Sequence, residues 1–266
     1  MLAAAGVAGA LAFTASCASE GRDPTAREGE TGKNASEGRL GARPQPHRRH
    51  AGSPRPGLQT VARGEGGLLY IPSGYRPGRR WPLVVLLHGA GSDARSGIAP
   101  LAQLADGAGT ILLAPDSRDR TWDAVLDGYG PDVASIDALL EDVFERFSVD
   151  PKRLALGGFS DGASYALSLG LANGDLFTHL IAFSPGFIPP GRRRGRPAVY
   201  VSHGVSDPVL PVGRCSRRIV PSLRRAGYDV DYREFPGGHT VPPDLAREAL
   251  GSLSSPLPEG ARSTSR

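Results

Sequence analysis

The sequence predicts an α/β fold with a mostly parallel central sheet and helices on both faces. Two observations carry this prediction. Short apolar runs bounded by Pro and Gly, typical of buried strands, alternate with longer segments whose apolar residues recur at helical spacing. This alternation continues from about residue 68 to residue 253, as in chains whose parallel strands are joined by crossover helices. Ligands of such sheets bind beyond the carboxyl ends of the strands.

Each element follows from one of these two patterns. The apolar runs with the length and flanks of buried strands are Leu68 to Ile71, Leu83 to Leu87, Thr110 to Ala114, Arg153 to Leu156, Leu180 to Phe183, Ala198 to Ser202 and Val230 to Phe235. Helical spacing is clearest from Val133 to Phe147. The other predicted helices are Pro100 to Ala108, Asp161 to Leu171, Arg214 to Ala226 and Pro243 to Leu253.

Composition divides the chain into four parts. Residues 1–17 hold an apolar, small-residue run ending in Ala15-Ser16-Cys17, which predicts a secretory signal or a lipoprotein-type segment with Cys17 as the lipid-bearing residue. We therefore expect an exported protein, either secreted or membrane-anchored, rather than a cytoplasmic one. Residues 18–57 and 254–266 are rich in Gly, Pro, Arg, Glu and Ser, which predicts a disordered linker and a disordered tail. Residues 58–253 remain as one folded domain.

Charge and cysteine content exclude several function classes. Because 31 Lys and Arg stand against 27 Asp and Glu, no strong polyanion preference follows, and the arginine run at 192–196 is interpreted as a solvated loop rather than a nucleic-acid site. Two cysteines exclude a disulfide scaffold, and Cys215 is interpreted as an unreactive core or surface residue. Neither a metal-binding nor a nucleotide-binding motif occurs, so we expect no metal and no bound nucleotide.

The most specific motif is Gly158-Phe159-Ser160-Asp161-Gly162, a G-x-S-x-G pentapeptide. It directly follows a predicted strand and directly precedes a predicted helix, which is the context of a nucleophile elbow. Glycines on both sides allow a tight turn that pushes the serine hydroxyl outward. The same pentapeptide also occurs as a simple turn, but this context predicts Ser160 as a catalytic nucleophile.

A serine hydroxyl is a weak nucleophile at neutral pH, so it needs a base and an acid that orients the base. Asp207 follows one later strand, and His239 lies in a glycine-rich loop after the next. The chain order is serine, acid, histidine, and each residue follows the carboxyl end of a strand. We therefore predict a triad of Ser160, Asp207 and His239.

Ester or thioester hydrolysis also needs hydrogen-bond donors for the oxyanion of the tetrahedral intermediate. An early strand runs straight into His88-Gly89-Ala90-Gly91, a glycine-rich turn that can present a backbone N–H. The amide of Asp161 begins a predicted helix, where the helix dipole favours negative charge. The predicted oxyanion hole consists of the amides of Ala90 and Asp161.

Together these segments resemble the phospholipase/carboxylesterase and polyhydroxybutyrate-depolymerase-like esterase branch of the α/β-hydrolase superfamily, over about residues 68–253. The segments that carry the resemblance are Leu86-Leu87-His88-Gly89, the pentapeptide around Ser160, Ser202-His203-Gly204, Asp207-Pro208-Val209-Leu210-Pro211 and Gly238-His239. The resemblance implies an α/β-hydrolase fold and a cofactor-free ester or thioester hydrolase. Asp161 and Ala163 depart from the residues usual in the depolymerases and the thioesterases respectively, so the subfamily stays open.

Other residues have two interpretations. Trp122 lies in a segment after the strand at 110–114, where an aromatic side chain could either line the substrate pocket or simply pack. We take it as the candidate substrate-binding residue. His179 and His203 are interpreted as structural. Since no long insertion lies between residues 171 and 198, we expect an open cleft without a lid.

We therefore expect a serine hydrolase that cleaves small-molecule or oligomeric carboxylic esters through an acyl-enzyme. The alternatives are a non-catalytic surface-tethered binding protein of the same fold, a thioesterase, and a peptidase of the prolyl-oligopeptidase kind. Such peptidases carry an additional gating domain, for which only about 58 residues precede the core here. Neither the acyl group, the alcohol nor the oligomeric state follows from the sequence.

Overall fold

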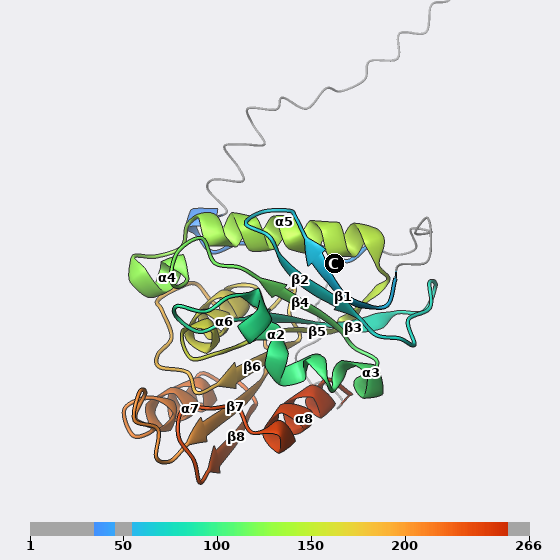
Figure 1. The fold of residues 1–266 in the computed structure, drawn as a ribbon. Helices are drawn as coiled ribbons and strands as arrows, with labels where there is room; N and C mark the ends of the chain where they lie inside the picture. The colour runs from blue at the N-terminus through green and yellow to red at the C-terminus, as the bar shows by residue number, and fades with distance from the viewer. Residues whose placement is uncertain (1–34, 46–54, 255–266) are drawn as a thin grey trace, which may run out of the picture.

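One sheet of eight strands forms the centre of the computed structural model, which describes residues 35–45 and 55–254 (Figure 1). The strand order is β1-β2-β4-β3-β5-β6-β7-β8. Strands β1 and β2 are antiparallel to their neighbours, and the six strands from β4 to β8 along the sheet are parallel. The predicted fold class, a mostly parallel α/β sheet, is confirmed.

The elements have the following bounds. The strands are β1 (Gly57–Val61), β2 (Gly67–Ile71), β3 (Trp81–Leu87), β4 (Ile111–Pro115), β5 (Val149–Phe159), β6 (His179–Phe183), β7 (Ala198–Gly204) and β8 (Val230–Phe235). The helices are α2 (Ala94–Ala102), α3 (Ala105–Ala108), α4 (Asp123–Leu126), α5 (Pro131–Arg146), α6 (Asp161–Ala172), α7 (Ser216–Arg225), α8 (Pro243–Gly251) and the 3-10 turn η1 (Ser252–Ser254).

Helices cover both faces of the sheet. Side chains alternate between the two faces along each strand, so Leu83 and Val85 of β3 face one layer while Val84 and Leu86 face the other. The first layer is packed by α5, α6 and α7, and the second by α2, α3 and α8. Burial on both faces explains why the parallel strands are continuous apolar runs in the sequence.

Three local differences from the sequence prediction have physical causes. Strand β1 was not predicted because its only large apolar residues, Leu58 and Val61, are three positions apart and so do not show the two-residue period of a strand. The helix expected from Pro100 begins earlier, since Asp93 caps α2 by accepting a hydrogen bond from the Ser96 amide, and Pro100 is tolerated inside it. Helix α4 was missed because four residues are too few to show a helical period.

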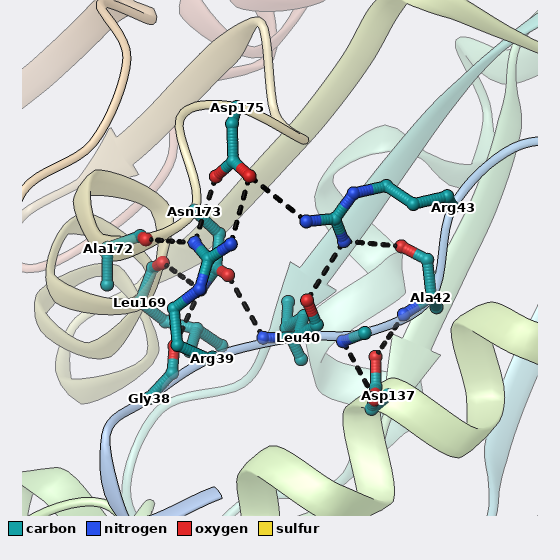
Figure 2. A network of polar contacts seen from close by, with 11 residues as sticks. Gly38, Arg39, Leu40, Ala42, Arg43, Asp137, Leu169, Ala172, Asn173 and Asp175 are labelled. Atoms are coloured by element: carbon teal, nitrogen blue, oxygen red, sulfur yellow. Dashed lines mark hydrogen bonds and ion pairs between the residues drawn. The ribbon is translucent and has the colours of Figure 1, made fainter. Parts of the chain in front are cut away.

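The linker prediction is wrong for residues 35–45, which pack against α5 and α6 as a strap (Figure 2). Leu40 is only 1% exposed and belongs to the main hydrophobic core. The buried side chain of Asn173 donates to the Gly38 carbonyl at 2.7 Å and accepts from the Leu40 amide at 3.0 Å. One apolar side chain and backbone hydrogen bonds thus order a segment whose composition alone predicts disorder.

Charged groups hold this strap on two sides through residues 39–43. Arg39 makes two hydrogen bonds to the carboxylate of Asp175, each 2.9 Å long, and this contact lowers the pKa of Asp175 to about 2. Arg43 binds the same carboxylate at 3.0 Å. The carboxylate of Asp137 on α5 accepts hydrogen bonds from the amides of residues 41 and 42. Figure 2 shows the strap lying between these two carboxylates.

The predicted signal or lipoprotein segment, including Cys17, and all but the first residue of the predicted C-terminal tail lie outside the described residues. Within the ranges 35–45 and 55–254, no helix is both long and apolar enough to cross a membrane.

His179, at the start of β6, makes stability depend on pH. Burial lowers its pKa from 6.5 to about 4. Between these pH values the unfolded chain binds the proton and the folded protein does not, so stability is complete above pH 6.5 and falls as pH drops towards 4. The full loss is about 3 kcal/mol. We expect His179→Gln to flatten the urea-unfolding free energy over this range, with a residual slope from His203, whose pKa burial also lowers. An unchanged slope would contradict this origin.

Candidate active site

The predicted site residues meet at the topological switch point of the sheet. After β3 the chain adds β4 on one side and then crosses to β5 on the other. The turn after β3 and the turn after β5 therefore open side by side at the carboxyl edge, where open α/β sheets bind ligands. These two turns contain Ala90 and Ser160.

The backbone around Ser160 is strained in the way a nucleophile elbow requires. Ser160 has φ 57° and ψ −121°, a conformation that non-glycine residues rarely adopt. The flanking glycines allow close backbone approach. A Cβ at Gly158 would lie 2.5 Å from the Gly162 backbone, and a Cβ at Gly162 would lie 2.1 Å from the Leu87 carbonyl. A larger residue at either position would force the elbow apart.

Ser160, His239 and Asp207 form a continuous hydrogen-bonded series. The Nε2 atom of His239 lies 2.9 Å from Ser160 Oγ, and its Nδ1 atom lies 2.6 Å from Asp207 Oδ2. Because an ionised carboxylate only accepts hydrogen bonds, Nδ1 carries the proton and Nε2 is free to accept one from the serine. The geometry suits a general base poised on a nucleophile.

Several contacts keep Asp207 ionised and in place. Burial raises the pKa of this carboxyl, but hydrogen bonds from the Leu210 amide, His239 and the Val209 amide outweigh it, and the net pKa lies below the ordinary value. His203 is fully buried beside it, with Nε2 3.3 Å from Asp207 Oδ2. Since Nε2 of His203 donates to the Leu210 carbonyl at 2.7 Å, this histidine braces the loop that holds Asp207.

The two predicted oxyanion donors flank the serine. Asp161 is the first residue of α6, and Ala90 follows Gly89, where a Cβ would lie 3.3 Å from Ser160 Cβ. Within the part of the chain that the structure describes, neither the Ala90 N–H nor the Asp161 N–H donates to a protein acceptor. Both amides are thus available to an oxygen that develops negative charge next to Ser160.

Trp122 does not line an open pocket. It is fully buried, and its ring stacks on Tyr165 at 5.4 Å. Its indole N–H donates to the His88 carbonyl at 2.9 Å, which anchors the turn that leads to Ala90. Trp122 therefore supports the turn that contains Ala90, and the prediction of direct substrate contact is corrected for this reason.

Two further side chains hold the turns on either side of Ser160, and neither was given a role from the sequence. The His88 ring accepts a hydrogen bond from the Ser117 amide through Nε2, at 3.1 Å, and so ties the turn to the loop after β4. The Thr121 hydroxyl donates to the carboxylate of Asp161 at 2.9 Å. His88 lies in a segment that carries the resemblance, whereas the only signal of Thr121 was its place after a strand end, which it shares with many loop residues.

The contact between Trp122 and His88 leads to a test. Trp122→Phe keeps most of the packing volume but leaves the buried His88 carbonyl without its donor, at a cost of about 1–3 kcal/mol. For the ester hydrolysis that the sequence predicts, we expect kcat to fall about tenfold with little change in KM, because the turn is looser but substrate contacts persist. Steady-state kinetics beside a thermal melt would check this. A changed KM at unchanged kcat would instead support direct substrate contact.

No cluster of three His, Cys, Asp or Glu side chains able to hold a metal ion occurs among residues 35–45 and 55–254. Cys215 is buried next to the start of α7, and burial raises the pKa of its thiol. A higher thiol pKa means less thiolate at neutral pH.

The sequence is similar to one protein family and to several characterised proteins. The family model described as Phospholipase/Carboxylesterase matches residues 131–255. A probable feruloyl esterase C of Aspergillus terreus is 31% identical over 165 residues, 59% of this chain and 59% of its own length. An acyl-protein thioesterase 1 of Gibberella zeae is 31% identical over 121 residues, 41% of this chain and 50% of its own. The chain thus spans roughly half to three fifths of the curated relatives it matches.

Solved structures show the same fold. A ferulic acid esterase of Anaeromyces mucronatus, solved in complex with ferulic acid, superposes with a TM-score of 0.59. The superposition covers 76% of this chain and 92% of the other, at 20% sequence identity. At that identity the likeness speaks for the fold alone.

Proposed function

We propose that this chain is a serine hydrolase of carboxylic esters that works through an acyl-enzyme. The support is the match of residues 131–255 to the phospholipase/carboxylesterase family model and the fold that the chain shares with a ferulic acid esterase. Ser160 is the nucleophile, His239 the general base and Asp207 the acid that orients it. The amides of Ala90 and Asp161 form the oxyanion hole. The observation that carries the proposal is the series of hydrogen bonds from Ser160 through His239 to Asp207.

The reaction follows from these roles. Ser160 Oγ attacks the carbonyl carbon while His239 Nε2 takes its proton, and the carbonyl oxygen becomes an oxyanion that accepts hydrogen bonds from the two amides. His239 then protonates the leaving alcohol, and the acyl group stays on the serine. A water molecule, deprotonated by His239, attacks the acyl-enzyme and releases the acid. Asp207 stabilises the imidazolium form of His239 at each step.

The proposal is tested with a panel of p-nitrophenyl esters and feruloyl esters, run beside matched p-nitroanilides. Feruloyl esters enter the panel because of the names of the relatives. We expect ester turnover and no anilide turnover. Anilide cleavage without ester preference would favour the peptidase alternative, and no turnover of any substrate would favour the non-catalytic one.

Thioester hydrolysis is the second candidate, favoured by the similarity to an acyl-protein thioesterase. The same triad and oxyanion hole serve both reactions, since the leaving group is the only difference. Paired esters and thioesters of one acyl group separate the two. A kcat/KM more than tenfold higher for the thioester would make thioesters the substrate.

We also propose that the enzyme is exported, and that Cys17 is the site of a lipid anchor. The support is the apolar run before Cys17 and the polar stretch after it. The mass of the mature N-terminus, measured on protein from a bacterial host, distinguishes a lipoprotein from a secreted enzyme. In the same host, labelled palmitate should enter the wild type and not Cys17→Ala.

A further inference from the structure

Exposed apolar side chains gather at the edge of the sheet that holds the triad. The large hydrophobic residues exposed in the described ranges are Leu58 at 46%, Leu126 at 65%, Phe187 at 44%, Val205 at 44% and Val209 at 61%. All except Leu58 follow the carboxyl ends of β4, β6 or β7. Single exposed apolar residues are ordinary on a protein surface, but a concentration at one edge is a mark of a binding surface.

Two of the loops at this edge meet directly beside the triad. Ser164, on the first turn of α6, bonds to the Ser160 carbonyl through its amide at 3.0 Å and accepts a hydrogen bond from the Gly186 amide at 2.9 Å. Gly186 packs on Leu210, since a Cβ at Gly186 would lie 3.2 Å from Leu210 Cδ2. The Leu210 amide then donates to Asp207 at 2.8 Å. This series of contacts starts at the nucleophile and returns to the triad acid.

Phe187 and Val209 stand next to this junction. Phe187 directly follows Gly186, Val209 directly precedes Leu210, and both side chains are exposed. The two loops carry no charged residue over 184–191 or 208–213. These two loops are therefore apolar, and their side chains offer no partner to a charged substrate group.

We propose that Phe187, Val209 and Leu210 form an apolar subsite that binds an alkyl or aryl group of the ester. The proposal rests on the proposed esterase function. An ester whose carbonyl carbon lies at Ser160 and whose oxygen faces the two amides extends its acyl and alcohol groups away from the serine. The subsite lies in the direction in which one of these two groups extends from Ser160. The enzyme therefore prefers esters with an apolar group over acetate esters of small alcohols and over charged esters.

Kinetic tests use two substrate series, p-nitrophenyl esters from acetate to octanoate and acetates from methyl to benzyl. The first varies the acyl group and the second the alcohol. In Phe187→Ser or Val209→Ser we expect the ratio of kcat/KM for the large member to that for the smallest to fall about tenfold in one series. Leu58→Ser, an equally exposed change on β1, should leave both ratios unchanged. Unchanged ratios in both series would overturn the subsite.

A binding measurement separates failure of the subsite from failure of the proposed reaction. Phenyl hexanoate binding to Ser160→Ala, measured by calorimetry, needs no turnover. We expect a Kd about tenfold higher in Ser160→Ala/Phe187→Ser. Binding that depends on Phe187 without any wild-type hydrolysis would refute the esterase and leave the subsite standing. Wild-type hydrolysis together with binding that does not depend on Phe187 would refute the subsite alone. The subsite would also be refuted if Phe187→Ser changed the oligomeric state, measured by sedimentation, and left binding and kinetics unchanged.

Discussion

Ser160→Ala is expected to lower ester-hydrolysis kcat by a factor on the order of 10⁴ or more and to abolish labelling by a fluorophosphonate probe. The reason is that, among residues 35–45 and 55–254, only Ser160 combines a hydroxyl on a strained elbow with a histidine 2.9 Å away. Alanine removes the hydroxyl without adding bulk, so the fold and the apolar surface beside the triad remain. Steady-state kinetics and in-gel labelling of the purified variant measure both effects.

Ser206→Ala is the matched control, because Ser206 is exposed next to Asp207 and has no part in the proposed reaction. It should keep full labelling and activity. His239→Ala should lose nearly as much kcat as Ser160→Ala, and the double variant should lose no more, since the two side chains act as one unit. Labelling that persists in Ser160→Ala would assign the nucleophile to another serine.

The arrangement of the site could be predicted because its signals are local. The nucleophile elbow consists of five adjacent residues, and its glycines are required because a Cβ at either one would lie only 2.1–2.5 Å from a neighbouring backbone atom. The order of strands places Asp207 and His239 at the same sheet edge as Ser160, so chain order alone predicted that they would meet.

The role of Trp122 could not be predicted in this way. Its position after a strand end indicated the correct edge of the sheet, but whether a side chain at that edge points into the cleft or into the core depends on non-local packing. Here Tyr165 of α6 supplies a stacking partner and His88 a carbonyl for the indole. The single N–H of an indole can donate equally well to a buried acceptor or to a substrate, so the sequence does not distinguish the two.

The strap at residues 35–45 was missed for a related reason. Composition measures how much apolar surface a segment has, and this segment has little. It does not measure whether the folded domain already offers a site for a single leucine and a buried amide for two backbone groups. The Leu40 amide donates a hydrogen bond to the side chain of Asn173, which is 133 positions away in the chain.

Deleting residues 1–54 is therefore expected to destabilise the domain strongly, whereas deleting residues 1–34 retains every contact described for the strap. The longer deletion uncovers the core surface under Leu40, a loss of about 2–5 kcal/mol by analogy with large-to-small core substitutions. It also removes the two hydrogen bonds between Asn173 and the strap, at about 0.5–1.5 kcal/mol each. The sum is a large part of the 5–15 kcal/mol that typically holds a domain folded.

Soluble yield and the melting temperature of the two truncated proteins test this directly. If the longer deletion does not yield folded protein, Leu40→Ala in the full chain gives the same information, because it removes only the apolar contact. Arg43→Ala is its matched control, since the Arg43 side chain is 39% exposed and its ion pair with Asp175 contributes about 1 kcal/mol or less. Leu40→Ala should lower the melting temperature well beyond Arg43→Ala. Equal melting temperatures for the two deletions would show that the hydrolase domain begins at β1 and that the strap adds nothing to its stability.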